Sequence, residues 1–148
     1  MFSSGSILYF TPFYFPNGNQ PKNKYFIVLA NCGDDLIIAS LPTSHDHIPA
    51  KLEKKHGCIN NDEMRVNCYF FESKRIISEC GTFYFPIDTY VYGEQAKMLS
   101  LQKLNDTYPQ EGKDYLKLAN LHKDELKALK QCLYSSGSTI NKIKRHLK

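Results

Sequence analysis

The sequence lacks the short motifs on which several large enzyme classes depend. It contains no Walker phosphate loop and none of the patterns GxGxxG, HExxH or GxSxG, so it offers no basis for the chemistries built on them. No apolar run reaches about 18 residues, and neither a membrane span nor a membrane partner is expected. The first residues, "MFSSGSILYF", carry no basic segment ahead of a long apolar stretch, which argues against a secretory leader.

Cysteine is present in an odd number and without any CxxC pair. The five residues are Cys32, Cys58, Cys68, Cys80 and Cys132. Because no leader is expected, we interpret all five as reduced thiols of a cytoplasmic protein. Cys32 and Cys68 follow or lie within strand-like runs and are expected to act as small apolar fillers.

Tryptophan is absent, whereas ten Tyr and nine Phe give the chain of 148 residues a composition typical of strands. A hydrophobic content of 42% is enough for a buried core in one domain. The positive charge is uneven, because residues 121–148 hold seven Lys or Arg and only two Asp or Glu. This basic end permits a nucleic-acid or acidic-protein partner, but it also fits a solvated helix face rich in lysine.

Residues 1–93 have the pattern of a small β domain. Two apolar runs, 25–31 and 36–41, are joined by the turn sequence "CGDD" and predict an antiparallel hairpin. The segment 11–24, with three Pro and three Asn, predicts a loop. Further strands are expected at 6–10, 64–72, 74–78 and 82–93. Short strands with short turns favour a small barrel or sandwich, and we expect a barrel.

Residues 94–148 change to helical spacing and are predicted to form a C-terminal helical extension packed on the barrel. Apolar residues recur every three or four positions within 94–104, 122–136 and 139–148. Gly137 is a plausible stop for the second helix, and Ser138 can cap the third. The predicted fold is therefore mainly β, a small barrel followed by two or three α-helices.

Three segments of the first half resemble the MazF/PemK-type toxin endoribonucleases. They are "GSILYFTPFYFPNGN", "KNKYFIVLA" and "LIIASLPTS", which correspond to that family's opening strand and aromatic loop, its second strand and its third strand. The likeness extends over about residues 5–48. It implies an SH3-like barrel that forms a homodimer, cuts single-stranded RNA without metal or other cofactor, and is held inactive by an antitoxin protein.

The same resemblance implies positions for an active site. Thr43 and Ser44 stand where the family has hydroxyl residues of its site, and Lys24 stands in place of the family's functional Arg. Tyr25 replaces the Pro that follows this Arg. A lysine offers a point charge, whereas an arginine offers a planar fork that holds two phosphate oxygens. This departure leaves open a non-catalytic relative that binds RNA or protein.

The residues themselves support a site at this place. Antiparallel pairing of the two predicted strands brings Lys24, Thr43 and Ser44 to one open end. Cleavage by the 2′-hydroxyl needs a base, an acid and donors to the phosphate oxygens. His45 and His47 follow directly and titrate near neutral pH, so they are candidates for acid and base. The alternative is that both are solvated loop residues.

The loop 11–24 is a candidate RNA-binding surface. Tyr14 could stack on a base, and Lys22 and Lys24 could contact phosphates. Phe13 and Phe15 are expected to close the end of the barrel instead. A separate reading of the same region is a zinc site, since Zn²⁺ accepts His and Cys ligands. Its candidate ligands are His45, His47, His56 and Cys58, although their spacing matches no well-defined zinc pattern.

Overall fold

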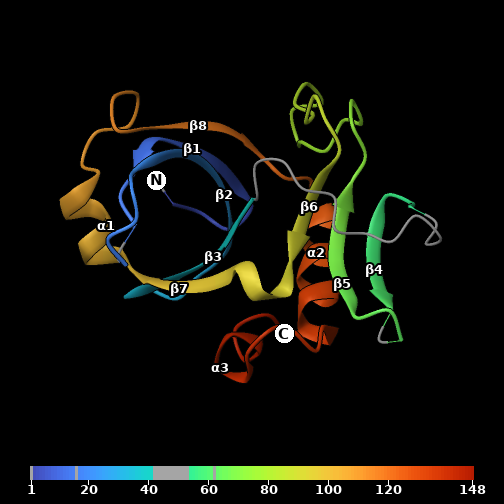
Figure 1. Ribbon diagram of the computed structural model, residues 1–148. Helices are drawn as coiled ribbons and strands as arrows, with labels where there is room; N and C mark the ends of the chain where they lie inside the picture. The colour runs from blue at the N-terminus through green and yellow to red at the C-terminus, as the bar shows by residue number, and fades with distance from the viewer. Residues whose placement is uncertain (1, 16, 42–53, 62) are drawn as a thin grey trace.

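The computed structural model describes residues 2–15, 17–41, 54–61 and 63–148. Over these residues the chain is mainly β, with eight strands in two sheets and three α-helices (Figure 1). The elements are β1 (Ser6–Phe13), β2 (Lys22–Asn31), β3 (Asp35–Ser40), β4 (Gly57–Asn61), β5 (Val66–Phe71), β6 (Thr89–Tyr92), the 3-10 helix η1 (Gly93–Gln95), β7 (Ala96–Ser100), α1 (Leu101–Thr107), β8 (Tyr115–Asn120), α2 (Lys123–Ser135) and α3 (Asn141–Lys144).

The larger sheet has five antiparallel strands in the order β7-β3-β2-β1-β8. Its centre is the predicted hairpin of β2 and β3, which is confirmed. The turn between them is closed by the Cys32 N–H, which donates to the Asp35 carbonyl at 2.8 Å. β1 and β7 flank the hairpin, and β8 pairs with the free edge of β1.

The five-stranded sheet curls around an aromatic core (Figure 1). One face, which we call the α1 face, presents Phe10, Phe26, Val28 and Ile38 to α1. Phe10 is 1% exposed and contacts the ring of Tyr108 at 4.7 Å. In the part of the chain that is described, no pairing joins the edge strands β7 and β8, so the sheet does not form a closed barrel.

The smaller sheet has the order β4-β5-β6 and packs on α2. The core on this side includes Ile27 from the larger sheet, Phe71 from the smaller one, and Leu129 and Leu133 from α2, all fully buried. α2 packs against β4 and β5 of the smaller sheet (Figure 1). Because the same helix side chains contact residues of both sheets, one continuous core joins them. No helix among these residues has the length and apolar content that a bilayer span requires.

The C-terminal part differs from its sequence-based prediction in several elements. The helix expected at 122–136 is confirmed by α2, but the one expected at 94–104 is wrong in its first half, where β7 pairs with β3 from Ala96 to Ser100. Met98 pairs opposite Ile37, so a sheet edge overrides the helical spacing of its neighbours. The third helix is reduced to Asn141–Lys144. β8, at Tyr115–Asn120, was not expected.

Two of the predicted strands are also corrected. Residues 74–78 form no strand apart from an isolated bridge between Ser78 and Leu121. The strand expected across 82–93 is confined to Thr89–Tyr92. The segment before it contains Pro86, and a proline supplies no N–H for a ladder hydrogen bond.

The expectation of five reduced thiols is wrong for two of them. Cys58 of β4 and Cys132 of α2 form a disulfide with a Cα–Cα distance of 5.4 Å. The other three are not in disulfides, and Cys68 is buried whereas Cys32 and Cys80 are exposed. Cys58 and Cys132 are 74 residues apart in the sequence, and the sequence gives no indication that they pair. The pairing arises because α2 packs across the smaller sheet.

Candidate functional site

A groove of about 640 Å³ opens on the α1 face of the larger sheet. Its floor is formed by β2, β3 and β7, and the loop that follows β1 forms its wall. Its lining mixes aromatic rings, amides, a hydroxyl and a cation: Phe13, Phe15, Asn17, Asn19, Phe26, Ile38, Ser40, Gln95, Lys97, Met98 and Leu99.

Strand register explains why these side chains meet. Ile38 lies directly opposite Lys97, and Ser40 lies directly opposite Phe26. Directly paired residues project from the same face of a sheet, so these four side chains share the α1 face. The Ser40 hydroxyl also donates to the Gln95 side-chain oxygen at 2.7 Å, which holds this amide at the groove.

The charge of the groove has one sign. Lys97 is exposed and lines it, and no carboxylate belongs to the lining within the part of the chain described. Lys24 lies two positions before Phe26 on β2, and alternation along the strand places it on the same face. Burial, together with the nearby charge of Lys22, lowers the pKa of Lys24. Three cations therefore lie along this side of the sheet.

The aromatic residues of the loop after β1 divide between core and surface. Phe13 is buried, and its ring contacts Phe26 at 4.7 Å and Phe15 at 5.3 Å. Tyr14 is 54% exposed. Its backbone N–H donates to the Tyr108 hydroxyl at 2.7 Å, and its ring stacks on that of Tyr108. The exposed face of Tyr14 is therefore held at the surface in a fixed place.

Four of the predicted catalytic residues, Thr43, Ser44, His45 and His47, lie outside the described residues. The chain reaches them from Leu41, whose N–H donates to the Tyr25 carbonyl at 3.1 Å. Tyr25 follows Lys24 on β2, so Leu41, the last described residue before this gap, lies beside the first half of β2. Their predicted approach to Lys24 stays a prediction.

No family model, no curated protein and no solved structure matches the chain. The chemistry of the groove is therefore argued from its own residues. The predicted binding residues Lys22, Lys24 and Tyr14 do not line the groove, and sequence reasoning missed Ser40, Gln95 and Lys97, which do. A strand predicted at residues 96–100 would have indicated Lys97, because pairing of that strand with β3 places this lysine opposite Ile38.

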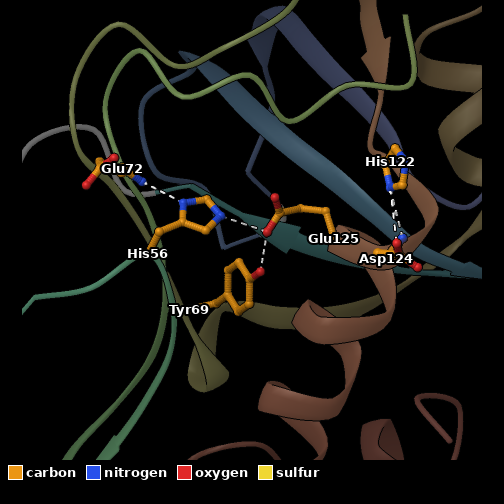
Figure 2. A network of polar contacts seen from close by, with 6 residues as sticks. All are labelled: His56, Tyr69, Glu72, His122, Asp124 and Glu125. Atoms are coloured by element: carbon orange, nitrogen blue, oxygen red, sulfur yellow. Dashed lines mark hydrogen bonds and ion pairs between the residues drawn. The ribbon is translucent and has the colours of Figure 1, made fainter. Parts of the chain in front are cut away.

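A second polar cluster lies under α2 and was not predicted as a unit. Figure 2 shows His56, Tyr69 and Glu125 pointing toward one another from the segment before β4, from β5 and from α2. The His56 Nε2 atom lies 2.9 Å from a Glu125 carboxylate oxygen, and the Tyr69 hydroxyl donates to the same oxygen. The His56 and Glu125 side chains are only 7% and 14% exposed.

The hydrogen bonds of this cluster define the tautomer of His56. The Glu72 backbone N–H donates to His56 Nδ1 at 3.1 Å (Figure 2), so Nδ1 is an acceptor and Nε2 carries the proton that it donates to Glu125. Burial, and then the hydrogen bond and charge of Glu125, raise the pKa of Tyr69. Both ring nitrogens of His56 are occupied, so this cluster fastens α2 to the smaller sheet and leaves no nitrogen for a substrate.

The zinc alternative is contradicted for its described half. His56 is engaged by Glu125 and Glu72, and Cys58 is bonded to Cys132. Neither of these residues is available as a ligand. Over the described positions, no three His, Cys, Asp or Glu side chains gather in a way that could hold a metal ion.

Proposed function

We propose that this protein binds single-stranded RNA in the groove on the α1 face. The observation that carries the proposal is the lining itself, in which aromatic rings, amides and a lysine are combined without a carboxylate among the described residues. Proteins that bind single-stranded nucleic acids use the same combination. Cations neutralise the phosphates of the nucleic-acid backbone, and aromatic rings stack on the unpaired bases. The cations Lys22 and Lys24 extend this surface along β2.

Each kind of side chain has a separate task in this proposal. The exposed ring of Tyr14 offers a stacking surface for a base. Asn17, Asn19 and Gln95 line the groove with groups that both donate and accept, as the edges of an unpaired base require. Lys97 and Lys24 neutralise phosphates. A base in a duplex would not expose its edges to these groups, which favours a single strand.

Cleavage of the bound strand is the second candidate, favoured by the hydrogen bond from Leu41 to Tyr25, the residue that follows Lys24 on β2. In that case Lys24 neutralises the phosphate in the transition state, Thr43 and Ser44 donate to its oxygens, and His45 and His47 supply the base and the acid. The resemblance to toxin endoribonucleases would then extend to an SH3-like fold, a homodimer and an antitoxin partner.

Binding is tested with the full chain and short, unstructured, fluorescently labelled RNAs by fluorescence anisotropy over a range of salt. Substitution of Lys97→Gln or Lys24→Gln should each weaken binding and reduce the slope of log affinity against log salt by about one. Lys123 is an exposed lysine on α2, so Lys123→Gln is the matched control. It should leave the affinity for RNA and its salt dependence unchanged. If no RNA binds at low salt, or if the control has the same effect, the proposal is wrong.

Cleavage is measured with the same RNAs in buffer containing a metal chelator. Fragments with a 5′-hydroxyl that disappear on Lys24→Ala and on Thr43→Ala, together with toxicity on expression, would establish the endoribonuclease. RNA that is bound but stays intact would instead identify the non-catalytic binding module.

A further inference from the structure

A small pocket of about 190 Å³ lies where β5, β6 and the turn after α2 meet. Its lining shares no residue with the groove on the α1 face. Six residues line it: Arg65, Val66, Asn67, Tyr92, Glu94 and Ser138. The pocket is unusual because several departures from ordinary structure converge on it.

The first departure is an unpartnered buried acceptor. Within the described part of the chain, only Asn67 Oδ1 and Thr139 Oγ1 are buried side-chain oxygen or nitrogen atoms without a hydrogen-bond partner. Such atoms are rare because a buried polar group without a partner is costly, and each one calls for an explanation. Asn67 lines the pocket, and Thr139 follows Ser138, which also lines it.

The second departure is a cluster of hydroxyls packed on Gly93. A Cβ at this glycine would lie 2.5 Å from Ser138 Oγ and from Thr139 Oγ1, and 2.6 Å from Ser136 Oγ. No side chain fits there, so the bare glycine lets the turn after α2 approach the chain between Tyr92 and Glu94. The Ser136 and Ser138 hydroxyls bond to each other at 2.8 Å. The cluster holds Ser138, which lines the pocket, against the chain at Gly93.

The third departure is the backbone of Arg65. Its φ is 55°, and among the described residues only Arg65 and Lys74 are non-glycine residues with a positive φ. This left-handed conformation is unfavourable for a residue that carries a Cβ. Such costs are tolerated chiefly at sites where the position of a side chain matters. Here the conformation directs Arg65 to the lining of the pocket.

The fourth departure concerns charge. Arg65 and Glu94 both line the pocket, yet neither forms an ion pair or side-chain hydrogen bond within the described structure. The pocket therefore combines an unpaired cation, an unpaired anion and a buried acceptor that lacks a donor. A ligand that satisfies all three must carry a negative group, a positive group and N–H donors close together.

We propose that this pocket binds a free α-amino acid. Its carboxylate would pair with the Arg65 guanidinium, which suits a carboxylate geometrically. Its ammonium group would donate to Glu94 and to Asn67 Oδ1, which removes the unpartnered acceptor. Val66 and Tyr92 would contact the ligand side chain. The volume of 190 Å³ equals that of about six water molecules in the liquid, which suits a small zwitterion.

The proposal is tested on the full chain without RNA, so that its result does not depend on the proposed function. Each of the standard amino acids at millimolar concentration is screened for a rise in melting temperature, and those that raise it are measured by calorimetric titration. A ligand bound only by the folded state must raise the melting temperature as its concentration increases. Propionate and propylamine, which carry one charged group each, should not reproduce the rise.

Substitutions identify the site. Arg65→Gln and Glu94→Gln should each abolish the titration heat. The matched controls are Lys74→Gln, the other cation with a positive φ, and Glu63→Gln, another exposed carboxylate, and both should bind as the unchanged protein does. Asn67→Leu should abolish binding without lowering the melting temperature of the ligand-free protein, because it removes an acceptor that has no partner.

Three binding results would each overturn the proposal. They are the absence of a response to every amino acid, equal binding of propionate or propylamine, and retained binding by Arg65→Gln or Glu94→Gln. A marked loss of melting temperature in Asn67→Leu would also contradict it, since it would mean that Asn67 serves the fold and not a ligand.

Discussion

Cys80 occupies an exposed turn in which its neighbours act on its thiol. Its sulfur lies 3.4 Å from the Ser78 hydroxyl and 2.9 Å from the Thr82 hydroxyl. These hydrogen bonds, Ser78 first and Thr82 second, lower the pKa of Cys80 to about 7. Hydrogen bonds to a charged form favour that form, so the thiolate becomes populated at a pH lower than is usual for cysteine.

We therefore predict that Cys80 is alkylated half-maximally near pH 7. Thr82→Val removes the second of these hydrogen bonds and should move the rate profile to higher pH. Ser78 is left unchanged, because its hydroxyl also accepts the N–H groups of Thr82 and Phe83. The measurement is the rate of iodoacetamide labelling against pH, read by mass spectrometry in a Cys32→Ser background. Identical profiles for the two proteins would contradict the prediction.

At the scale of single elements, α2 is held to the smaller sheet in two ways. The disulfide joins it to β4, and the Glu125 carboxylate joins it to Tyr69 and His56. A disulfide between residues 74 positions apart lowers the conformational entropy of the unfolded chain and so stabilises the folded state. The attachment of this helix therefore depends on oxidised sulfur as well as on packing.

The double substitution Cys58→Ser and Cys132→Ser should lower the free energy of unfolding by about 4 kcal/mol. Urea denaturation without reductant, followed by circular dichroism, measures this. The matched control is Cys32→Ser with Cys80→Ser, two exposed free thiols, and its midpoint should stay unchanged. An equal midpoint for the parent chain and the 58/132 variant would show that the disulfide carries no stability.

The elements that the sequence predicts well are those whose pattern is local. The hairpin of β2 and β3 and the helix α2 were expected because alternation, a tight turn and spaced leucines lie within short windows. The sequence predicts helix over the residues of β7, because their strand character comes from β3, a partner far along the chain. The lining of the groove was missed in part for the same reason, since Lys97 and Gln95 come from the second part of the chain and meet β3 only in the folded sheet.

At the scale of the whole molecule, the residue pattern changes from strand-like to helical at residue 93. The larger sheet nevertheless contains strands from both sides of this position. β7 pairs with β3 and β8 pairs with β1, so the second part of the chain supplies both edges of the larger sheet. α2 and α3 add Leu129, Leu133, Ile143 and Leu147 to the core. The predicted unit 1–93 would thus expose two strand edges and an uncovered apolar face.

We predict that a fragment of residues 1–93 does not fold, whereas the complete chain unfolds in one transition. The fragment loses the pairing partners of β1 and β3 and much of the core that α2 covers. Proton–nitrogen correlation spectra should show collapsed amide dispersion for the fragment and wide dispersion for the full chain. A fragment with native-like dispersion would show that residues 1–93 are an independent domain.

The position of β1 has a consequence for how the protein is made. Its two neighbours in the sheet, β2 and β8, come from near the start and near the end of the chain. During synthesis β1 can pair with β2 early, but its other edge stays open until residue 120 has left the ribosome. Strand edges left open in this way invite association between nascent chains. Completing the larger sheet therefore requires a late strand to pair with an early one, a contact between residues far apart in the chain.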